Sequence, residues 1–208
     1  MKALGKVAVF GGTFSPVHNG HLAAMKAFAE TVRPDILYII PTAIPPHKQR
    51  NDLATDAQRL AMLNIAVEEL DVPCRVYVSD MEILRGGRSY TADTLFELNK
   101  IAEKLYLYCG TDMILTIDEW HKAHLIFKFA TVAYMQREED FRFNEEVEKK
   151  VAELSDRFIA DIIKIPAVPI EVSSSEVREK IAKDEDISEL VPKGVGEYIK
   201  REGIYVND

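Results

Sequence analysis

Short apolar runs alternate along the chain with segments whose large apolar residues recur at helical spacing. Strand-length runs occur at residues 6–10, 36–41, 74–79, 104–110, 131–137 and 161–166. Several are apolar on consecutive residues, which is typical of strands covered by helices on both faces. Helical spacing is found near residues 20–32, 55–70, 91–103, 112–128 and 143–158. This alternation predicts the α/β class, a Rossmann-like parallel sheet with right-handed crossovers and helices on both faces.

The alternation of strands and helices ends after the sixth strand-length run, and two further helical segments follow. Pro192 suits the first turn of the second segment, and Gly203 suits its end. No repeat, low-complexity tract or linker interrupts the pattern. We therefore expect a single domain over 1–208, with a core at 1–166 and a small helical C-terminal part at 167–208.

Composition places the chain among ordinary globular proteins. Of its 208 residues, 47% are hydrophobic and 29% are charged. The net charge of −8 argues against a nucleic-acid partner, which normally needs a basic face. Cys74 and Cys109 show no metal-ligand spacing and suit buried free thiols. Because no apolar run is long enough for a signal peptide or a membrane span, we expect a cytoplasmic protein.

The stretch GGTFSPVHNGH leaves the first strand and enters the first helix. In a parallel sheet, ligands bind beyond the carboxyl ends of the strands. Gly11 and Gly12 lack side chains, so a ligand can approach the backbone closely. Asn19 is a favoured N-cap, which puts His21 in the first helical turn, where the helix dipole favours an anion. The pattern predicts an anion site flanked by the imidazoles of His18 and His21.

Two other interpretations of this stretch stay open. A glycine turn with polar residues is often only a tight loop between a strand and a helix. The two histidines also suit a metal ion, although no third His or Cys ligand lies nearby in the sequence. Further motifs along the chain are needed to separate these alternatives.

Five motifs in chain order resemble those of bacterial nicotinate-mononucleotide adenylyltransferases, which belong to the H-x-G-H nucleotidyltransferase superfamily. They are GGTFSPVHNGH at Gly11–His21, IPPHK at Ile44–Lys48, GGRSYTADTL at Gly86–Leu95, GTDMILTIDEWHKA at Gly110–Ala123 and VSSSEVR at Val172–Arg178. The ending VPKGVGEYIKREGIY also resembles the tail of that family. Each motif alone is modest evidence for the resemblance. Five of them in order, each at a strand end or a helix start, strongly favour membership of that family.

The resemblance implies transfer of AMP from ATP to nicotinate mononucleotide, which gives nicotinate adenine dinucleotide and pyrophosphate in NAD biosynthesis. It implies that His18, His21 and Arg178 contact the ATP phosphates and act in catalysis. The other ATP-binding positions that it implies are Gly11, Gly12, Thr13, Phe14, Ser173 and Ser174. Mg²⁺ is expected as a companion of ATP, held by phosphate oxygens and water rather than by a protein cage.

The resemblance places nicotinate mononucleotide on a second set of residues. Trp120, the only tryptophan, is the candidate for stacking on the pyridine ring. The backbone N–H groups of Thr91 and His121 are the implied donors to its carboxylate. The remaining positions of this set are Lys48, Tyr90, Gly110 and Asp112. Tyr90 and Asp112 suit structural roles equally well, the first by packing and the second as a helix cap.

Two positions depart from the family pattern. Ser15 stands where Asp is common, which removes a carboxylate from the loop, and His121 stands where Tyr is frequent. The second departure matters less if position 121 acts through its backbone N–H. Arg85 and Arg88 flank a Gly-Gly turn, a setting typical of solvated loop cations.

Three rival functions share part of these features. A pantetheine-phosphate adenylyltransferase resembles the chain in H-x-G-H, but it accounts for neither SYTADTL nor the segment that leads to Trp120. A class I aminoacyl-tRNA synthetase fragment would need a K-M-S-K-S loop, which is missing. A noncatalytic nucleotide sensor is expected to lose His18, His21 or Arg178, and all three are present. We expect ATP and nicotinate mononucleotide as partners, with homo-oligomerisation left open.

Overall fold

Six parallel strands form one sheet at the centre of the molecule. The computed structural model describes residues 4–44, 53–135, 141–167 and 170–206. The strands are β1 (Leu4–Gly12), β2 (Ile36–Pro41), β3 (Arg75–Val78), β4 (Ala102–Cys109), β5 (Ala130–Met135) and β6 (Ile162–Ile165). They lie in the order β3-β2-β1-β4-β5-β6, and each neighbouring pair is parallel. The prediction of a Rossmann-like α/β fold is confirmed.

The strand order reverses between β1 and β4. From β1, the sheet extends through β2 and β3 on one side and through β4, β5 and β6 on the other. Connections from the two central strands leave in opposite directions there, which opens a crevice beyond their carboxyl ends. Gly11 and Gly12 pair with Ile40 and Pro41 of β2. They are therefore the last residues of β1 and not, as the sequence pattern predicted, part of the turn.

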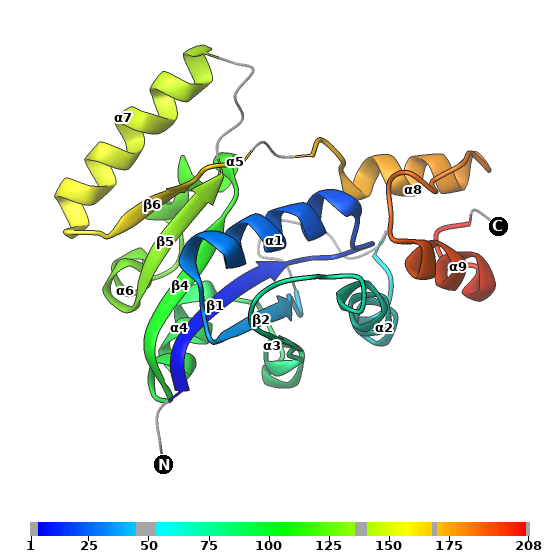
Figure 1. The fold of residues 1–208 in the computed structure, drawn as a ribbon, viewed down its shortest axis with the longest axis horizontal. Coiled ribbons are helices and arrows are strands. Elements are labelled where there is room, and N and C mark those ends of the chain that lie inside the picture. Colours follow the sequence, from blue (N-terminus) through cyan, green and yellow to red (C-terminus); the bar gives the residue numbers. More distant parts are fainter. Residues whose placement is uncertain (1–3, 45–52, 136–140, 168–169, 207–208) are drawn as a thin grey trace.

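Helices cover both faces of the sheet (Figure 1). One face carries α1 (Asn19–Val32), α2 (Asp56–Val67), α8 (Ser174–Ala182) and α9 (Lys193–Glu202). The other carries α4 (Thr91–Asn99), α5 (Thr111–Ile114), α6 (Ala123–Phe129) and α7 (Phe141–Phe158). The two faces are separate cores because strand side chains alternate: Ala8 and Phe10 belong to the first, and Val7 and Val9 to the second.

The helix predicted over 112–128 is wrong as a single element. The structure divides it into α5, the 3₁₀ turn η1 (Ile117–Glu119) and α6. Lys122, just before α6, has a φ of 52°, a left-handed conformation that interrupts a continuous helix. The short helix α3 (Met81–Arg85) was not predicted, because five residues are too few to show a helical period.

The C-terminal helices pack on the rest of the chain through the first core. Val195 and Ile199 of α9 are buried in the same cluster as Met62 and Leu63 of α2, and Figure 1 shows α9 beside α2. Gly203 ends α9 in a left-handed conformation, as predicted. Pro192 occupies the N-cap of α9, one residue before the predicted position.

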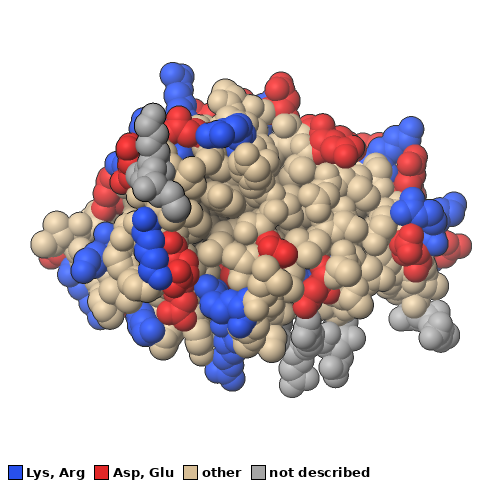
Figure 2. Space-filling view, turned by 90° about the horizontal axis from the view of Figure 1, so that it is seen from below, with Lys and Arg blue, Asp and Glu red and all other residues tan. Residues whose placement is uncertain are grey.

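The described helices include none long and apolar enough to cross a membrane. Figure 2 shows one face of the molecule, on which acidic and basic side chains are mixed around a hollowed, largely uncharged centre. This face therefore carries no continuous basic stretch, in agreement with the net charge of −8.

Leu37 of β2 is fully buried in the first core. We expect Leu37→Ala to lower the free energy of unfolding by about 2–5 kcal/mol, because it leaves a cavity. Leu84 on α3 is 76% exposed, and Leu84→Ala is the matched control, with an expected change within about 0.5 kcal/mol. Urea denaturation of both variants measures the difference, and similar losses in the two would contradict this description of the core.

Candidate active site

A cavity of about 360 Å³ lies where the strand order reverses. Its walls come from the ends of β1 and β2, from the start of α4 and from the loop after η1. The predicted substrate-binding residues that line it are Gly11, Gly12, Thr13, Tyr90, Thr91, Trp120 and His121. The fold thus brings together residues from three distant parts of the chain. The first three were predicted to bind ATP, and the other four were predicted to bind nicotinate mononucleotide.

His18 and His21 cap the first turn of α1. The helix begins at Asn19, so His18 is the N-cap and the prediction of Asn19 in that role was wrong. Nδ1 of His18 accepts the backbone N–H of His21, and Nδ1 of His21 accepts the backbone N–H of His18, both at 3.3 Å. The two rings stack with their centroids 3.6 Å apart. This capping box, built from two imidazoles, satisfies donors that a helix start leaves free.

The hydrogen bonds of the two imidazoles define where their protons lie. A ring nitrogen that accepts a hydrogen bond carries no proton, so the neutral form of each ring carries its proton on Nε2. Burial lowers the pKa of His18 to about 4. Burial and the neighbouring His18 lower the pKa of His21 well below its usual value. At neutral pH the pair therefore provides two uncharged Nε2–H donors.

The two residues between the histidines tie α1 to the C-terminal part. The backbone N–H of Asn19 donates to the carbonyl of Leu190 at 2.8 Å, and its side-chain amide donates to the carbonyl of Glu189 at 2.9 Å. A Cβ atom at Gly20 would lie 2.8 Å from the carbonyl oxygen of Ile170. Only glycine therefore fits at position 20 without moving the backbone.

Phe14 braces the histidine pair from inside the fold. Its side chain is 1% exposed, and its ring meets the ring of His21 edge-on with centroids 5.0 Å apart. A Cβ at Gly12 would lie 2.8 Å from the Phe14 ring, so the glycine makes room for this packing. Phe14 was predicted as an ATP-binding position, but its side chain belongs to the core and the residue does not line the cavity.

Helix α8 docks on the turn after β1. Arg178 Nη1 donates to the carbonyl of Ser15 at 2.9 Å, and the hydroxyl of Ser174 donates to the carbonyl of Pro16 at 2.9 Å. Ser173 is the N-cap of α8, and its hydroxyl oxygen accepts a backbone N–H of the first turn at 3.0 Å. Arg178 also lines a second cleft, of about 650 Å³. Arg178 and Ser174 thus contact the turn that leads to the histidines, outside the first cavity.

The start of α4 forms the opposite side of the cavity. Tyr90 occupies the N-cap and Thr91 is the first helical residue, where backbone N–H groups have no partner within the helix. The Tyr90 ring lies against the ring of His121, with centroids 4.2 Å apart. Trp120 is partly buried against the second core and lines the cavity. Aromatic faces beside helix-start N–H groups suit a flat ring that carries a carboxylate.

Besides Phe14, the predicted residues that do not line this cavity are His18, His21, Ser173, Ser174, Arg178, Gly110 and Asp112. Gly110 is the N-cap of α5, so Asp112, which follows on the first turn and is exposed, does not cap that helix. Neither residue is among those that line the cavity. Lys48 lies outside the described residues.

The hydroxyl of Ser15 has partners of its own. Its Oγ accepts the backbone N–H of Ala54 at 2.9 Å and lies 2.8 Å from the hydroxyl oxygen of Tyr205. The turn after β1 is thereby linked to the segment before α2 and to the C-terminal segment. A hydroxyl at position 15 therefore braces the loop without a carboxylate.

Sequence reasoning missed a polar cluster at the wall of the cavity. The hydroxyl of Thr94 donates to the buried carboxylate of Glu82 at 2.5 Å and accepts from Arg85 at 2.9 Å. Nη2 of Arg85 also lies 3.7 Å from Oε1 of Glu82. Arg88 lines the cavity. Arg85 therefore has fixed polar partners, whereas Arg88 is exposed, as expected for a solvated loop cation. The spacing of Glu82 and Arg85, three residues apart, is the one sequence signal of this pair.

The described part of the chain contains no group of three or more His, Cys, Asp or Glu side chains arranged to hold a metal ion. In the histidine pair, both Nδ1 atoms already accept hydrogen bonds. Within these residues, the alternative of a metal site on His18 and His21 therefore lacks a third ligand.

Sequence comparison shows relatives over almost the whole chain. A profile of the family described as cytidylyltransferase-like matches residues 9–180. A probable nicotinate-nucleotide adenylyltransferase of Caldicellulosiruptor bescii is 34% identical, over 96% of this chain and 98% of that protein. A probable enzyme of the same name from Staphylococcus epidermidis is 33% identical, over 96% of this chain and 97% of that protein.

Structure comparison shows the same fold in solved proteins. The nicotinic acid mononucleotide adenylyltransferase of Plasmodium falciparum, solved in complex with NaAD, has a TM-score of 0.74 and 20% identity, with 96% of this chain and 97% of that chain covered. A putative nicotinate-nucleotide adenylyltransferase of Vibrio parahaemolyticus has a TM-score of 0.66 and 18% identity, with 100% and 98% covered. From its full-length relatives, the chain belongs to the nicotinate-nucleotide adenylyltransferases of the cytidylyltransferase-like family.

Proposed function

We propose that the chain transfers AMP from ATP to nicotinate mononucleotide, giving nicotinate adenine dinucleotide and pyrophosphate in NAD biosynthesis. The observation that carries the proposal is the cavity at the strand-order reversal, which joins Gly11 and Gly12 to Thr91 and Trp120. Full-length relatives named as nicotinate-nucleotide adenylyltransferases support it. The Plasmodium falciparum enzyme of the same fold was solved with NaAD and with APC.

The phosphate of nicotinate mononucleotide needs no general base. Its second pKa is about 6, so at neutral pH the nucleophile is mostly a dianion. A phosphate oxygen attacks the α-phosphorus of ATP as the bond from that phosphorus to the bridging oxygen of the β-phosphate breaks. Pyrophosphate leaves with the electron pair. The protein must hold two anions in line and stabilise charge that develops on the transferred and leaving groups.

We assign this stabilisation to the start of α1 and to Arg178. The Nε2–H groups of His18 and His21 are preorganised donors, and a comparable donor to developing charge contributes about 2.7–4 kcal/mol in other enzymes. Exposed Gly11, at which a Cβ would meet nothing within 4 Å, leaves its backbone open to a ligand. We expect ATP as its Mg²⁺ complex, in which phosphate oxygens and water hold the metal and charge on the leaving group is neutralised.

We assign the pyridine end of the substrate to the other wall of the cavity. Trp120 stacks on the ring, and the backbone N–H groups of Thr91 and His121 bind its carboxylate. The position of Tyr90 against His121 supports this assignment because it holds the two backbone segments beside each other. We place the reaction in the cytoplasm, since Cys74 and Cys109 are free thiols, as is usual in a reducing compartment.

The substrate itself is the first test. Backbone N–H donors suit a carboxylate, whereas an amide directs its NH₂ at them and leaves buried groups unpaired, at a cost of about 1–3 kcal/mol. We expect nicotinate mononucleotide to be preferred over nicotinamide mononucleotide by roughly tenfold to a few hundredfold. Pyrophosphate release from ATP, with both mononucleotides and phosphopantetheine offered in parallel, measures this preference. Faster turnover of phosphopantetheine would instead support the pantetheine-phosphate adenylyltransferase alternative.

The two ends of the site are separable by mutation. Trp120→Ala should mainly raise the KM for the mononucleotide, because stacking contributes equally to ground and transition states. Aromatic stacking beyond burial is worth about 0.5–1.5 kcal/mol. Arg178→Ala should impair the use of ATP and leave mononucleotide binding largely intact. Initial rates with each substrate varied in turn test both; equal weakening of both substrates by Trp120→Ala, with a less stable fold, would make the tryptophan a core residue.

A further inference from the structure

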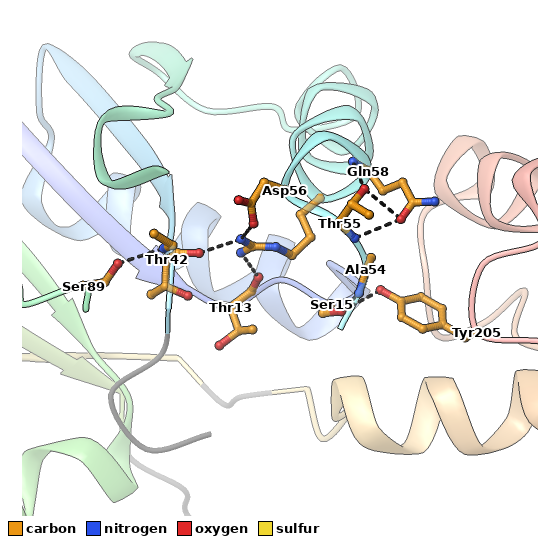
Figure 3. A network of polar contacts seen from close by, with 11 residues as sticks. Thr13, Ser15, Thr42, Ala54, Thr55, Asp56, Gln58, Ser89 and Tyr205 are labelled. Carbon is orange, nitrogen blue, oxygen red and sulfur yellow. Dashed lines mark hydrogen bonds and ion pairs between the residues drawn. The ribbon is translucent and has the colours of Figure 1, made fainter. Parts of the chain in front are cut away.

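Arg59 is a buried cation that the proposed reaction does not use. It lies on the buried side of α2 with Met62, Leu63 and Ala66, and it is 1% exposed. Its Nη1 donates to the carbonyl of Thr13 at 2.8 Å. Its Nη2 donates to the carbonyl of Thr42 and to the carboxylate of Asp56, both at 2.6 Å. Figure 3 shows Thr13, Thr42 and Asp56 turned toward this guanidinium.

The two carbonyls follow the ends of neighbouring strands, β1 and β2, where the backbone N–H of Thr42 donates to the carbonyl of Gly12 at 2.9 Å. Beyond this bond the two loops continue to different sides of the cavity. Thr13 follows Gly12 at the end of β1, on the side assigned to ATP. Thr42 follows β2, and the next residues bind the segment before α4: the N–H of Ala43 donates to Oγ of Ser89 at 2.8 Å. The N–H of Ser89 in turn donates to the carbonyl of Ile44 at 3.1 Å. Ser89 directly precedes Tyr90 and Thr91, on the side assigned to the pyridine ring.

We propose that Arg59 is a positioning residue that holds the loops after β1 and β2 at a fixed separation beyond their last backbone hydrogen bond, and with them the ATP side and the mononucleotide side of the cavity. This inference rests on the proposed function, because a fixed spacing matters only where two substrates react with each other. The path runs from Thr13 through the guanidinium to Thr42 (Figure 3). It continues along the chain to Ala43, whose N–H donates to Ser89, just before α4.

The shape of the guanidinium explains why this position carries an arginine. Its nitrogens lie in one plane and donate in fixed directions, so one side chain can hold two carbonyls at a set separation. An ammonium group is a compact donor on a flexible stem and fixes no such separation. A lysine at position 59 would keep the charge beside Asp56 and lose the geometry.

The role predicts a particular kinetic signature. Each substrate touches mainly one side of the cavity, so each side alone should still bind its own substrate. In-line attack requires both sides in register, and a misplacement of about 1 Å can cost about 100-fold in rate. Loss of Arg59 should therefore lower kcat while the Kd of each substrate, measured singly, stays near the wild-type value.

The test compares Arg59→Lys and Arg59→Ala with Arg201→Lys and Arg201→Ala. Arg201 is an exposed arginine on α9 that pairs with Glu202 and serves as the matched control. Calorimetric Kd values for ATP and for nicotinate mononucleotide are measured separately, and kcat is measured at saturation. Thermal melting curves give Tm and the folded fraction at the assay temperature. Guanidinium ion at a non-denaturing concentration is added to Arg59→Ala to refill the space of the missing group.

We expect kcat of Arg59→Lys to fall about 100-fold while both Kd values stay near the wild-type values. The Arg201 variants should keep their kcat. Guanidinium should partly restore the kcat of Arg59→Ala, and an equal concentration of sodium should not. A purely structural arginine would instead give a lower Tm and an unchanged kcat per folded molecule, which overturns the inference. A wild-type protein that makes no nicotinate adenine dinucleotide would refute the proposed function. An active wild type with equally active Arg59 variants would refute only the positioning role.

Discussion

At the first turn of α1, His18 and His21 each accept the backbone N–H of the other through Nδ1. These two hydrogen bonds give partners to two backbone N–H groups at the helix start and fix the orientation of both rings. They also leave the single proton of each neutral ring on Nε2, while burial keeps the pKa of His18 at about 4. The structural cap and the chemical donor are thus the same pair of side chains, and the proposed stabilisation of the phosphates depends on it.

The rest of the fold holds that pair in place. Parallel strands direct the loops after β1, β2 and β4 to one edge of the sheet, and the reversal of strand order leaves a cavity between them. Partly buried carbonyls at this edge need donors. Arg178 and Ser174 supply them to Ser15 and Pro16, and Arg59 supplies them to the neighbouring loops. The polar interior of the site is therefore built largely from contacts between loops.

Sequence predicted the alternation of strands and helices, and with it the sheet and the edge where the site lies, because long apolar periods are dictated by burial. The cap of α1 was misplaced by one residue because Asn is the commoner N-cap and a reciprocal pair of imidazoles has no distinctive spacing of its own. The helix over 112–128 was predicted whole because buried Ile114, Ile117 and Ile126 keep a helical period across the break before α6.

Residues that act through long-range contacts could not be found from local patterns. Glu82 and Thr94 meet only after α3 and α4 have folded together. Arg59 did leave a signal, since it occupies the position of an apolar residue in the stripe that continues with Met62, Leu63 and Ala66. A charge in an apolar stripe must find partners in the fold, but the sequence does not show that those partners are the carbonyls of Thr13 and Thr42.

The protonation state of His18 and His21 tests the central claim most directly. Long-range ¹H–¹⁵N correlation spectra of the histidine-labelled protein at pH 7, assigned with single histidine variants, distinguish the two neutral tautomers from the imidazolium. The structure predicts that both rings are neutral, with the proton on Nε2 and an unprotonated Nδ1. A proton on Nδ1, or an imidazolium at pH 7 in the free protein, would contradict the reciprocal cap and the donors assigned to it.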